Sequence, residues 1–256
     1  MLKTSSSNTS WIAYSQTNPQ AQLRLFCFPF AGGSASVFRD WQASLPPNIH
    51  VCPIELPGRG SRLLESPLDN IQTLVTELIT AIEPLLDLPF VLFGHSLGAL
   101  ICFELARYLH QEYGKVPLQL LVSGRQAPPI DDLSPMHALS DADLIAELHR
   151  LGGTPKTVLN TPEMLQLLLP MVRADLKIDE TYKYITSEPL SCPISVFGGL
   201  ADPETSLEDL EAWRKETQGE FSLQMFPGNH FFINTAKDLL LERISQILSV
   251  YICNPS

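Results

Sequence analysis

The segment Gly94–Gly98 (GHSLG) holds the residue pattern with the clearest chemistry, a serine between two glycines in the spacing GxSxG. An apolar run, Phe90–Phe93, precedes it, and a helical pattern over about Leu97–Gln111 follows it. At a sharp turn from strand to helix the serine backbone is strained, its hydroxyl projects from the sheet edge, and a Cβ on either glycine would crowd the turn. The pattern predicts that Ser96 is a nucleophile. The simpler alternative is a glycine-rich turn in which this serine only caps the helix.

A serine hydroxyl is a weak nucleophile at neutral pH and needs a positioned base. Of the six histidines, His230 is the best placed, because it follows the last predicted strand, Ser222–Phe226, on a loop of sequence PGN. Parallel strands carry their C-terminal ends to one edge of a sheet, so we expect this loop beside Ser96. The alternative for a loop histidine is a solvated surface group. His95 is adjacent to the serine in sequence, but we expect its side chain to point away and pack in the interior.

The base in turn needs an acid that fixes its tautomer and stabilises the imidazolium. Asp202 follows the predicted strand Pro193–Phe197 and is expected at the same edge of the sheet. Asp175 and Asp179 are rival acids in a helical insertion, and Asp202 could instead cap a helix that starts near Ser206. The order serine, aspartate, histidine along the chain is that of the α/β-hydrolase arrangement. This order favours Asp202.

Acyl transfer also needs hydrogen-bond donors for the oxyanion of the tetrahedral intermediate. The backbone N–H of Leu97, directly after the nucleophile, is one expected donor. The second is assigned to Ala31, in the loop after the predicted strand Leu23–Phe28. Gly32 and Gly33 in this loop allow a close approach of the backbone to a substrate. A plain glycine turn is the alternative.

These residues must be positioned by a sheet, and six short apolar runs are predicted as strands: Leu23–Phe28, His50–Ile54, Phe90–Phe93, Gln119–Ser123, Pro193–Phe197 and Ser222–Phe226. Helical patterns alternate with these runs, which predicts an α/β fold with a mostly parallel central sheet flanked by helices. The last helix is expected to begin near Thr235, whose spacing to Asp238 resembles a capping box.

Residues of about 127–190 form a long insertion between the fourth and fifth predicted strands, and we expect helices there within a single domain of residues 1–256. Thr161 and Pro162 are expected as the cap and first residue of one helix, and Pro170 should kink or end it. Such an insertion often forms a lid over the active site. The alternative is a packed helical layer that gates nothing.

Composition limits the classes of protein to consider. Hydrophobic residues make up 45% of the 256 residues, which is typical of a globular protein. Lys and Arg number 17 and Asp and Glu 28, so the net charge of −11 argues against a nucleic-acid-binding protein. Five cysteines without a CxxC motif favour a reducing, cytoplasmic compartment. No signal peptide or membrane-spanning run of about 18 apolar residues is expected.

Eight ordered blocks carry a resemblance to a known family: FPFAGGSASVFRDW (28–41), ELPGRGSR (55–62), FGHSLGAL (93–100), VSGRQAP (122–128), LGGTP (151–155), LPMVRADLKIDETY (169–182), FGGLADP (197–203) and FPGNHFFI (226–233). With them the sequence resembles the type II thioesterases, stand-alone α/β-hydrolases that accompany non-ribosomal peptide and polyketide synthases. The resemblance implies hydrolysis of acyl groups held as thioesters on the phosphopantetheine arm of acyl- or peptidyl-carrier proteins, with no cofactor or metal of the enzyme's own. It also favours a monomer.

The family pattern implies the same site residues: Ser96, Asp202 and His230 as the triad, with Ala31 and Leu97 as oxyanion donors. Two departures from it are Phe30, where many relatives carry histidine, and Asn229, where glycine is common. We expect Phe30 to affect the acyl pocket or its entrance.

Arg59 and Arg62 lie on a loop after the second predicted strand, also at the C-terminal edge. Arginine side chains suit phosphate groups or the acidic surface of a carrier protein, so both are candidate docking residues. The alternative is that they form internal salt bridges that lock the loop. Arg173 and Asp175 are expected as a structural pair.

Three rival functions remain at this point. The first is release of fatty-acyl chains from a fatty acid synthase by the same chemistry. The second is hydrolysis of oxygen esters by a carboxylesterase or lipase. The third is a non-catalytic carrier-binding or scaffolding protein, against which the presence of all three triad residues argues.

Overall fold

The computed structural model describes residues 11–14, 18–130 and 135–252. Its parallel sheet has the strand order β2-β1-β3-β4-β5-β6. The strands are β1 (Leu23–Phe28), β2 (Ile49–Pro53), β3 (Phe90–His95), β4 (Gln119–Ser123), β5 (Ile194–Gly199) and β6 (Phe221–Phe226). The predicted runs for β1 and β4 match residue for residue, and the others differ by one or two residues at one or both ends. The predicted parallel sheet is confirmed.

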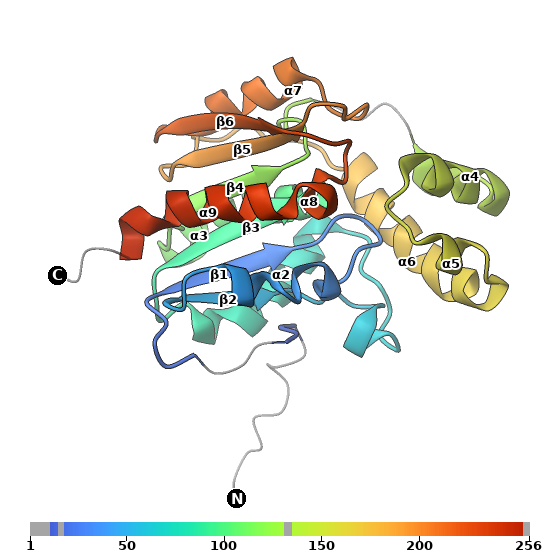
Figure 1. Cartoon of the computed structure of the whole chain (residues 1–256), viewed down its shortest axis with the longest axis horizontal. Helices are drawn as coiled ribbons and strands as arrows, with labels where there is room; N and C mark the ends of the chain where they lie inside the picture. Colours follow the sequence, from blue (N-terminus) through green and yellow to red (C-terminus); the bar gives the residue numbers. More distant parts are fainter. Residues whose placement is uncertain (1–10, 15–17, 131–134, 253–256) are drawn as a thin grey trace, which may run out of the picture.

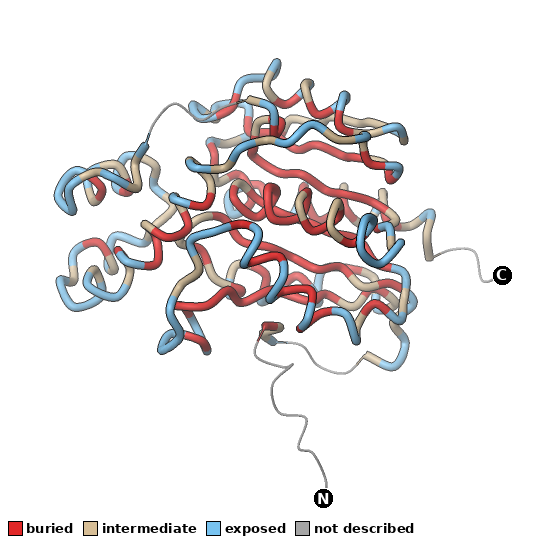
Figure 2. Tube along the Cα trace, turned by 180° about the vertical axis from the view of Figure 1, so that it is seen from behind, coloured by how far each residue is buried: buried red, intermediate tan, exposed pale blue. Residues whose placement is uncertain are grey.

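Alternate residues of each strand pack on opposite faces of the sheet. On β1, Phe26 and Phe28 join the apolar cluster that contains α2 (Ile71–Ile82) and α3 (Leu97–Tyr113). Leu25 and Cys27 join the cluster that contains α1 (Trp41–Ser44) and α9 (Lys237–Ile252). Helices therefore cover both faces, and the central strands are buried on both sides (Figures 1 and 2). This explains why the strands read as continuous apolar runs.

The remaining elements outside the insertion are short: η1 (Ala35–Phe38), η2 (Gly60–Arg62), η3 (Glu83–Leu85), α7 (Leu207–Glu211), η5 (Ala212–Glu216) and α8 (Phe232–Thr235). The last long helix, α9, begins at Lys237, two residues after the expected start, because Thr235 completes α8. The predicted capping role of Thr235 is therefore wrong. The four cysteines at 27, 52, 102 and 192 are buried free thiols, while Cys253 lies outside the described residues.

The segment between β4 and β5 is helical, as predicted: η4 (Met136–Ala138), α4 (Asp141–Leu151), α5 (Lys156–Leu159) and α6 (Pro162–Glu180). These helices lie beyond the C-terminal ends of the strands (Figure 1). Their side chains form an apolar cluster of their own, with Leu144 and Val172 at 0% and 1% exposure. The insertion thus carries a small core separate from the two clusters on the sheet.

The predicted start of α6 at Pro162 is confirmed, but two finer local expectations hold only in part. Of the two effects expected at Pro170, a kink or an end of the helix, the end does not occur, because the helix continues to Glu180. Thr161 occupies the capping position, but its hydroxyl donates to the Thr157 carbonyl at 2.7 Å. Packing of α6 against the rest of the insertion and the main core therefore outweighs the local cost of the proline.

Candidate active site

Ser96 sits at the turn from β3 to α3 with φ of 53° and ψ of −119°. This positive φ is strained for a residue with a side chain, and it is the conformation predicted for a nucleophile elbow. A Cβ at Gly94 would lie 2.1 Å from the Gly98 carbonyl oxygen, and one at Gly98 would lie 2.2 Å from that of Phe28. Both glycines are therefore required by space, as the sequence predicts. The Ser96 N–H donates to the Ser123 carbonyl at 2.8 Å and ties the elbow to β4.

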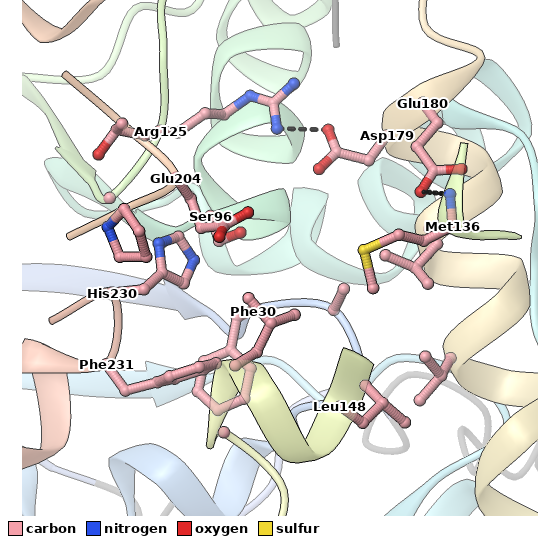
Figure 3. Close-up of a pocket in the computed structure, with 18 of the residues that line it drawn as sticks. Phe30, Ser96, Arg125, Met136, Leu148, Asp179, Glu180, Glu204, His230 and Phe231 are labelled. Atoms are coloured by element: carbon pink, nitrogen blue, oxygen red, sulfur yellow. Dashed lines mark hydrogen bonds and ion pairs between the residues drawn. The ribbon is translucent and has the colours of Figure 1, made fainter. Parts of the chain in front are cut away.

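His230 and Asp202 form a hydrogen-bonded pair at the same edge, with 2.9 Å between His230 Nδ1 and Asp202 Oδ2. Asp202 also accepts from the Glu204 N–H at 2.9 Å and from the Thr205 hydroxyl at 3.0 Å, and its side chain is fully buried. Since the carboxylate accepts, Nδ1 carries the proton and Nε2 is the free nitrogen of the neutral ring. Figure 3 shows His230 beside Ser96. The structure thus brings the three predicted residues together.

The hydrogen bonds of Asp202 decide its charge. Burial would raise the pKa of this carboxyl group. The hydrogen bond and charge interaction with His230, together with the hydrogen bonds from the Glu204 N–H and Thr205, outweigh burial and lower the pKa below its usual value. Asp202 is therefore ionised at neutral pH. An ionised carboxylate at this position fixes the histidine tautomer and stabilises a positive charge on the ring.

His95 lies beneath the site and does not reach the pocket. Its ring is completely buried, its Nδ1 is 2.8 Å from the Ser123 hydroxyl, and its centroid is 5.2 Å from that of His230. Burial, together with the nearby His230, lowers the pKa of His95 well below its usual value. The predicted packing role is confirmed, and a neutral His95 adds no positive charge next to His230.

The loop after β1 reaches the same site because the strand order reverses between β1 and β3. Sheets of this kind place their binding crevice at such a reversal. A tight turn, closed by the Gly33 N–H donating to the Phe30 carbonyl at 2.8 Å, contains Ala31. Ala31 lines the pocket with Ser96, and Leu97 is the first residue of α3, where helical N–H groups lack an intrahelical acceptor. Both predicted oxyanion donors therefore lie on elements that meet at Ser96.

The pocket in front of Ser96 has a volume of about 340 Å³. Phe30 lines it and packs edge-to-face against Phe231 at 5.0 Å between ring centroids. The insertion supplies five more apolar side chains: Met136, Leu148, Leu151, Val172 and Leu176. Asn229, the second departure from the family pattern, accepts a hydrogen bond from the Phe231 N–H at 3.0 Å.

One side of the pocket is polar, and the sequence did not predict the residues that form it. Arg125, after β4, forms an ion pair with Asp179 of α6 (Figure 3). Glu180 accepts from the backbone N–H groups of Met136 and His137 at 2.8 and 3.0 Å. Arg125 lies in one of the family blocks, and this was the available signal for it.

The expectation that Arg59 and Arg62 present a docking surface is wrong. Arg59 is 4% exposed and pairs with Asp175 of α6 at 2.6 Å. Arg62 is 5% exposed, pairs with Glu65 at 2.5 Å and stacks over the Trp11 ring. Both guanidinium groups are turned inward, so the internal salt bridges weighed as the alternative are what the structure shows.

The rival acids and the expected pair within α6 are also resolved by these contacts. Asp175 pairs with Arg59 and Asp179 with Arg125, whereas the described partner of His230 is Asp202. Arg173 pairs with Asp141 at 2.6 Å instead of with Asp175, two residues away on another face of the helix.

Comparison with known proteins identifies the class. A family model described as the thioesterase domain matches residues 23–248, and the chain belongs to this family. The gramicidin S biosynthesis protein GrsT of Aneurinibacillus migulanus is 46% identical over 91% of this chain and 91% of its own.

Two solved structures agree with this class. The RedJ thioesterase from the prodiginine pathway of Streptomyces coelicolor has a TM-score of 0.85 and 40% identity, covering 88% of this chain and 90% of its own. The type II thioesterase BorB from the borrelidin biosynthetic cluster has a TM-score of 0.84 and 37% identity, covering 93% and 97%. The resemblance to type II thioesterases and the α/β-hydrolase fold are confirmed, and the protein is a thioester hydrolase.

Two properties of the described residues bear on other classes of protein. Within residues 11–14, 18–130 and 135–252, no helix has the length and apolar character needed to cross a bilayer. The same part of the chain holds no cluster of three or more His, Cys, Asp or Glu side chains arranged to bind a metal ion.

Proposed function

We propose that this enzyme hydrolyses acyl or aminoacyl thioesters on the phosphopantetheine arm of carrier proteins and so clears stalled or wrongly primed carriers of non-ribosomal peptide or polyketide synthases. The names of its relatives, which refer to gramicidin S, prodiginine and borrelidin biosynthesis, support this setting. The observation that carries the chemistry is the strained Ser96 elbow in one pocket with the His230–Asp202 pair.

The proposed reaction has two halves. Ser96 Oγ attacks the thioester carbonyl while His230 Nε2 takes the hydroxyl proton, and the thiol of the pantetheine arm leaves with a proton returned by His230. Water then attacks the acyl-Ser96 ester, and His230 takes a proton from the water. As the second tetrahedral intermediate collapses, His230 returns this proton to Ser96 Oγ, the carboxylic acid is released and the serine hydroxyl is restored.

The surroundings of the triad support the charges this reaction develops. The ionised Asp202 stabilises His230 when its ring is protonated. A neutral His95, 5.2 Å away between ring centroids, does not oppose that charge. The N–H groups of Ala31 and Leu97 are proposed to bind the oxyanion, and one such donor is typically worth about 10²–10³ in turnover.

The pocket bears on the choice among substrates. A volume of about 340 Å³ lies near the lower end of the roughly 300–1,000 Å³ common for ligand sites, which favours a short acyl group over a long fatty-acyl chain. Phe30 is proposed to contact this group. We propose that carrier proteins are the macromolecular partners and that the enzyme is a cytoplasmic monomer. It is proposed to need no cofactor of its own. The insertion is proposed to act as a lid within a single domain.

The central test is Ser96→Ala, assayed on a panel of acyl-loaded carrier proteins with intact-mass detection of the freed arm. The variant should lose about 10³–10⁶ in turnover because it lacks the nucleophile. Asp202→Asn should also lose turnover, whereas Cys102→Ser, which is buried away from the pocket, serves as a folding control. A Ser96→Ala enzyme with wild-type turnover would remove this serine from the mechanism.

Rates on matched substrates separate the rival functions. The proposal expects short acyl-carrier thioesters to be hydrolysed faster than long-chain thioesters and faster than oxygen esters with the same acyl group. A preference for long chains would support fatty-acyl release, and a preference for oxygen esters would support a carboxylesterase.

A further inference from the structure

A buried ion pair joins the helical insertion to the loops of the main sheet. Arg59, after β2, and Asp175, in α6, form two hydrogen bonds, 2.6 Å from Nη1 to Oδ2 and 2.7 Å from Nη2 to Oδ1. Their side chains are 4% and 1% exposed. A bidentate pair of this kind fixes orientation as well as distance. It therefore sets the position of α6 relative to the loop that carries Arg59.

The same two side chains also hold the loop after β1. The Gly32 N–H donates to Asp175 Oδ2 at 2.8 Å. Arg59 Nη1 donates to the Gly33 carbonyl at 3.0 Å. The peptide groups on both sides of the Gly32–Gly33 bond are thus fixed by a charged partner, directly after Ala31, the proposed oxyanion donor.

Packing brings α6 against the same loop. Gly32 has φ of +76°, and a Cβ built on it would lie 2.9 Å from Cγ2 of Val172. Val172, one helical turn before Asp175, lines the pocket together with Ala31. The loop is therefore confined by an apolar contact on one side and by the ion pair on another.

Stability alone is a poor explanation for this pair. Burying two charges costs desolvation energy, and replacing a buried pair by apolar side chains of similar volume is often neutral or stabilising. The hydrogen bonds that the pair makes beyond itself include those to Gly32 and Gly33. A group that must bind an oxyanion has to be oriented before the charge develops, and such preorganisation is a large part of catalysis.

We propose that Arg59 and Asp175 are positioning residues for thioester hydrolysis, which hold the loop so that the Ala31 N–H points at the oxyanion formed on Ser96. Neither side chain touches the substrate, and both act through the loop. The inference rests on the proposed function, because it assumes the oxyanion role of Ala31.

The test replaces both charges at once, with Arg59→Met and Asp175→Leu in one variant. A short acyl thioester of N-acetylcysteamine is the substrate, because it has no carrier protein and so removes docking from the measurement. We expect kcat to fall about 10–100-fold through loss of orientation, with KM within threefold of wild type. The melting temperature should stay the same or rise.

A second readout separates positioning from a merely structural role. The inhibitor is a trifluoromethyl ketone analogue of the acyl group. A nucleophilic serine adds to its carbonyl carbon, and the carbonyl oxygen becomes an oxyanion like that of the reaction. If the double variant binds this oxyanion less well, Ki for the inhibitor should rise by the same factor by which kcat falls. The control is Arg173→Met with Asp141→Leu, an ion pair between α6 and the start of α4 whose side chains are 26% and 71% exposed. It should keep wild-type kcat and Ki.

Two results would overturn the positioning role of Arg59 and Asp175. A folded double variant with kcat within twofold of wild type, or with lost kcat but unchanged Ki, overturns the inference. If the double variant does not fold, Arg59→Lys keeps the charge and loses the second hydrogen bond, and it should show a smaller fall in kcat with a parallel rise in Ki; wild-type values would again overturn it. Wild-type turnover of Ser96→Ala is a separate result, which refutes the proposed mechanism itself.

Discussion

The site draws on two regions of the molecule. The loops just after β3, β5 and β6 carry Ser96, Asp202 and His230, whereas the insertion carries Leu148 and Val172, which line the pocket at Ser96. The strand ends are held by the parallel ladder and by two large apolar clusters. The insertion has its own smaller cluster and is tied to the sheet by side-chain ion pairs and by the packing of Ile178 of α6 in the main cluster. The groups proposed for the chemistry thus lie on the most constrained part of the fold. The shape of the acyl pocket depends on a part held by fewer, more specific contacts.

Alanine in place of a glycine should separate the two regions most strongly. At Gly98 a Cβ would meet the Phe28 carbonyl oxygen at 2.2 Å, so Gly98→Ala must shift the backbone of β1 or α3. We expect at least 3 kcal/mol of lost stability, roughly the upper end for overpacking, and loss of activity. At Gly152, which ends α4 with φ of +77°, a Cβ would meet nothing within 4 Å, and Gly152→Ala should cost about 1 kcal/mol through backbone strain alone.

Denaturant unfolding and kcat measure both effects. If Gly152→Ala proved as harmful as Gly98→Ala, the insertion would be as tightly constrained as the strand ends, and the contrast between the two regions would fail.

Two fully buried leucines test whether the insertion unfolds with the sheet. Leu121 of β4 and Leu144 of α4 are both 0% exposed, in different clusters. Leu121→Ala should lower the global free energy of unfolding by about 2–5 kcal/mol, the usual range for a buried leucine. Leu144→Ala should instead speed amide hydrogen exchange in α4 and α6, with a smaller change in the global transition.

Native-state hydrogen exchange resolved by segment is the measurement. Equal losses of protection throughout the molecule in the Leu144→Ala protein would show one cooperative unit, and the lid role proposed for the insertion would lose its support.

The same contrast explains how much could be predicted from the sequence. The β3–Ser96–α3 turn was predicted correctly because its rules are local: two glycines, an apolar run before them and a helical pattern after them. The proximity of His230 and Asp202 followed from one topological rule, that parallel strands end at one edge. These residues needed no knowledge of how distant helices pack.

No local pattern or topological rule predicts the contacts of the insertion. The partner of Arg59 is Asp175, 116 positions away, and the pairing depends on how α6 returns over the loop after β1. Local signals also misled: α6 continues through Pro170, and the Thr161 hydroxyl bonds to the nearby Thr157 carbonyl instead of to the first turn of α6. For Arg59 and Pro170 tertiary packing decides the outcome, and the sequence does not show which contacts form.

Acid titration gives the smallest expected effect and compares a carboxylate at the strand ends, Asp202, with one that pairs with the insertion, Asp69. The pKa of Asp202 is below its usual value, where its hydrogen bonds outweigh burial, and the pKa of Asp69 is lowered by a hydrogen bond from Lys177 of α6. A carboxyl group whose pKa is lower in the folded than in the unfolded protein stabilises the fold above the unfolded pKa of about 3.9, and this contribution is lost as the pH falls toward the folded pKa.

The difference in unfolding free energy between wild type and Asp202→Asn should therefore be about 1–2 kcal/mol at pH 6, typical of hydrogen bonds to a charged group, and should shrink below about pH 4. The Asp202 side chain is fully buried, whereas that of Asp69 is 53% exposed, so Asp69→Asn should change stability by less than about 1 kcal/mol at any pH. Urea unfolding of the three proteins between pH 3 and 7 measures both differences, and a larger effect at Asp69 would mean that the ties of the insertion, not the strand ends, carry the acid sensitivity.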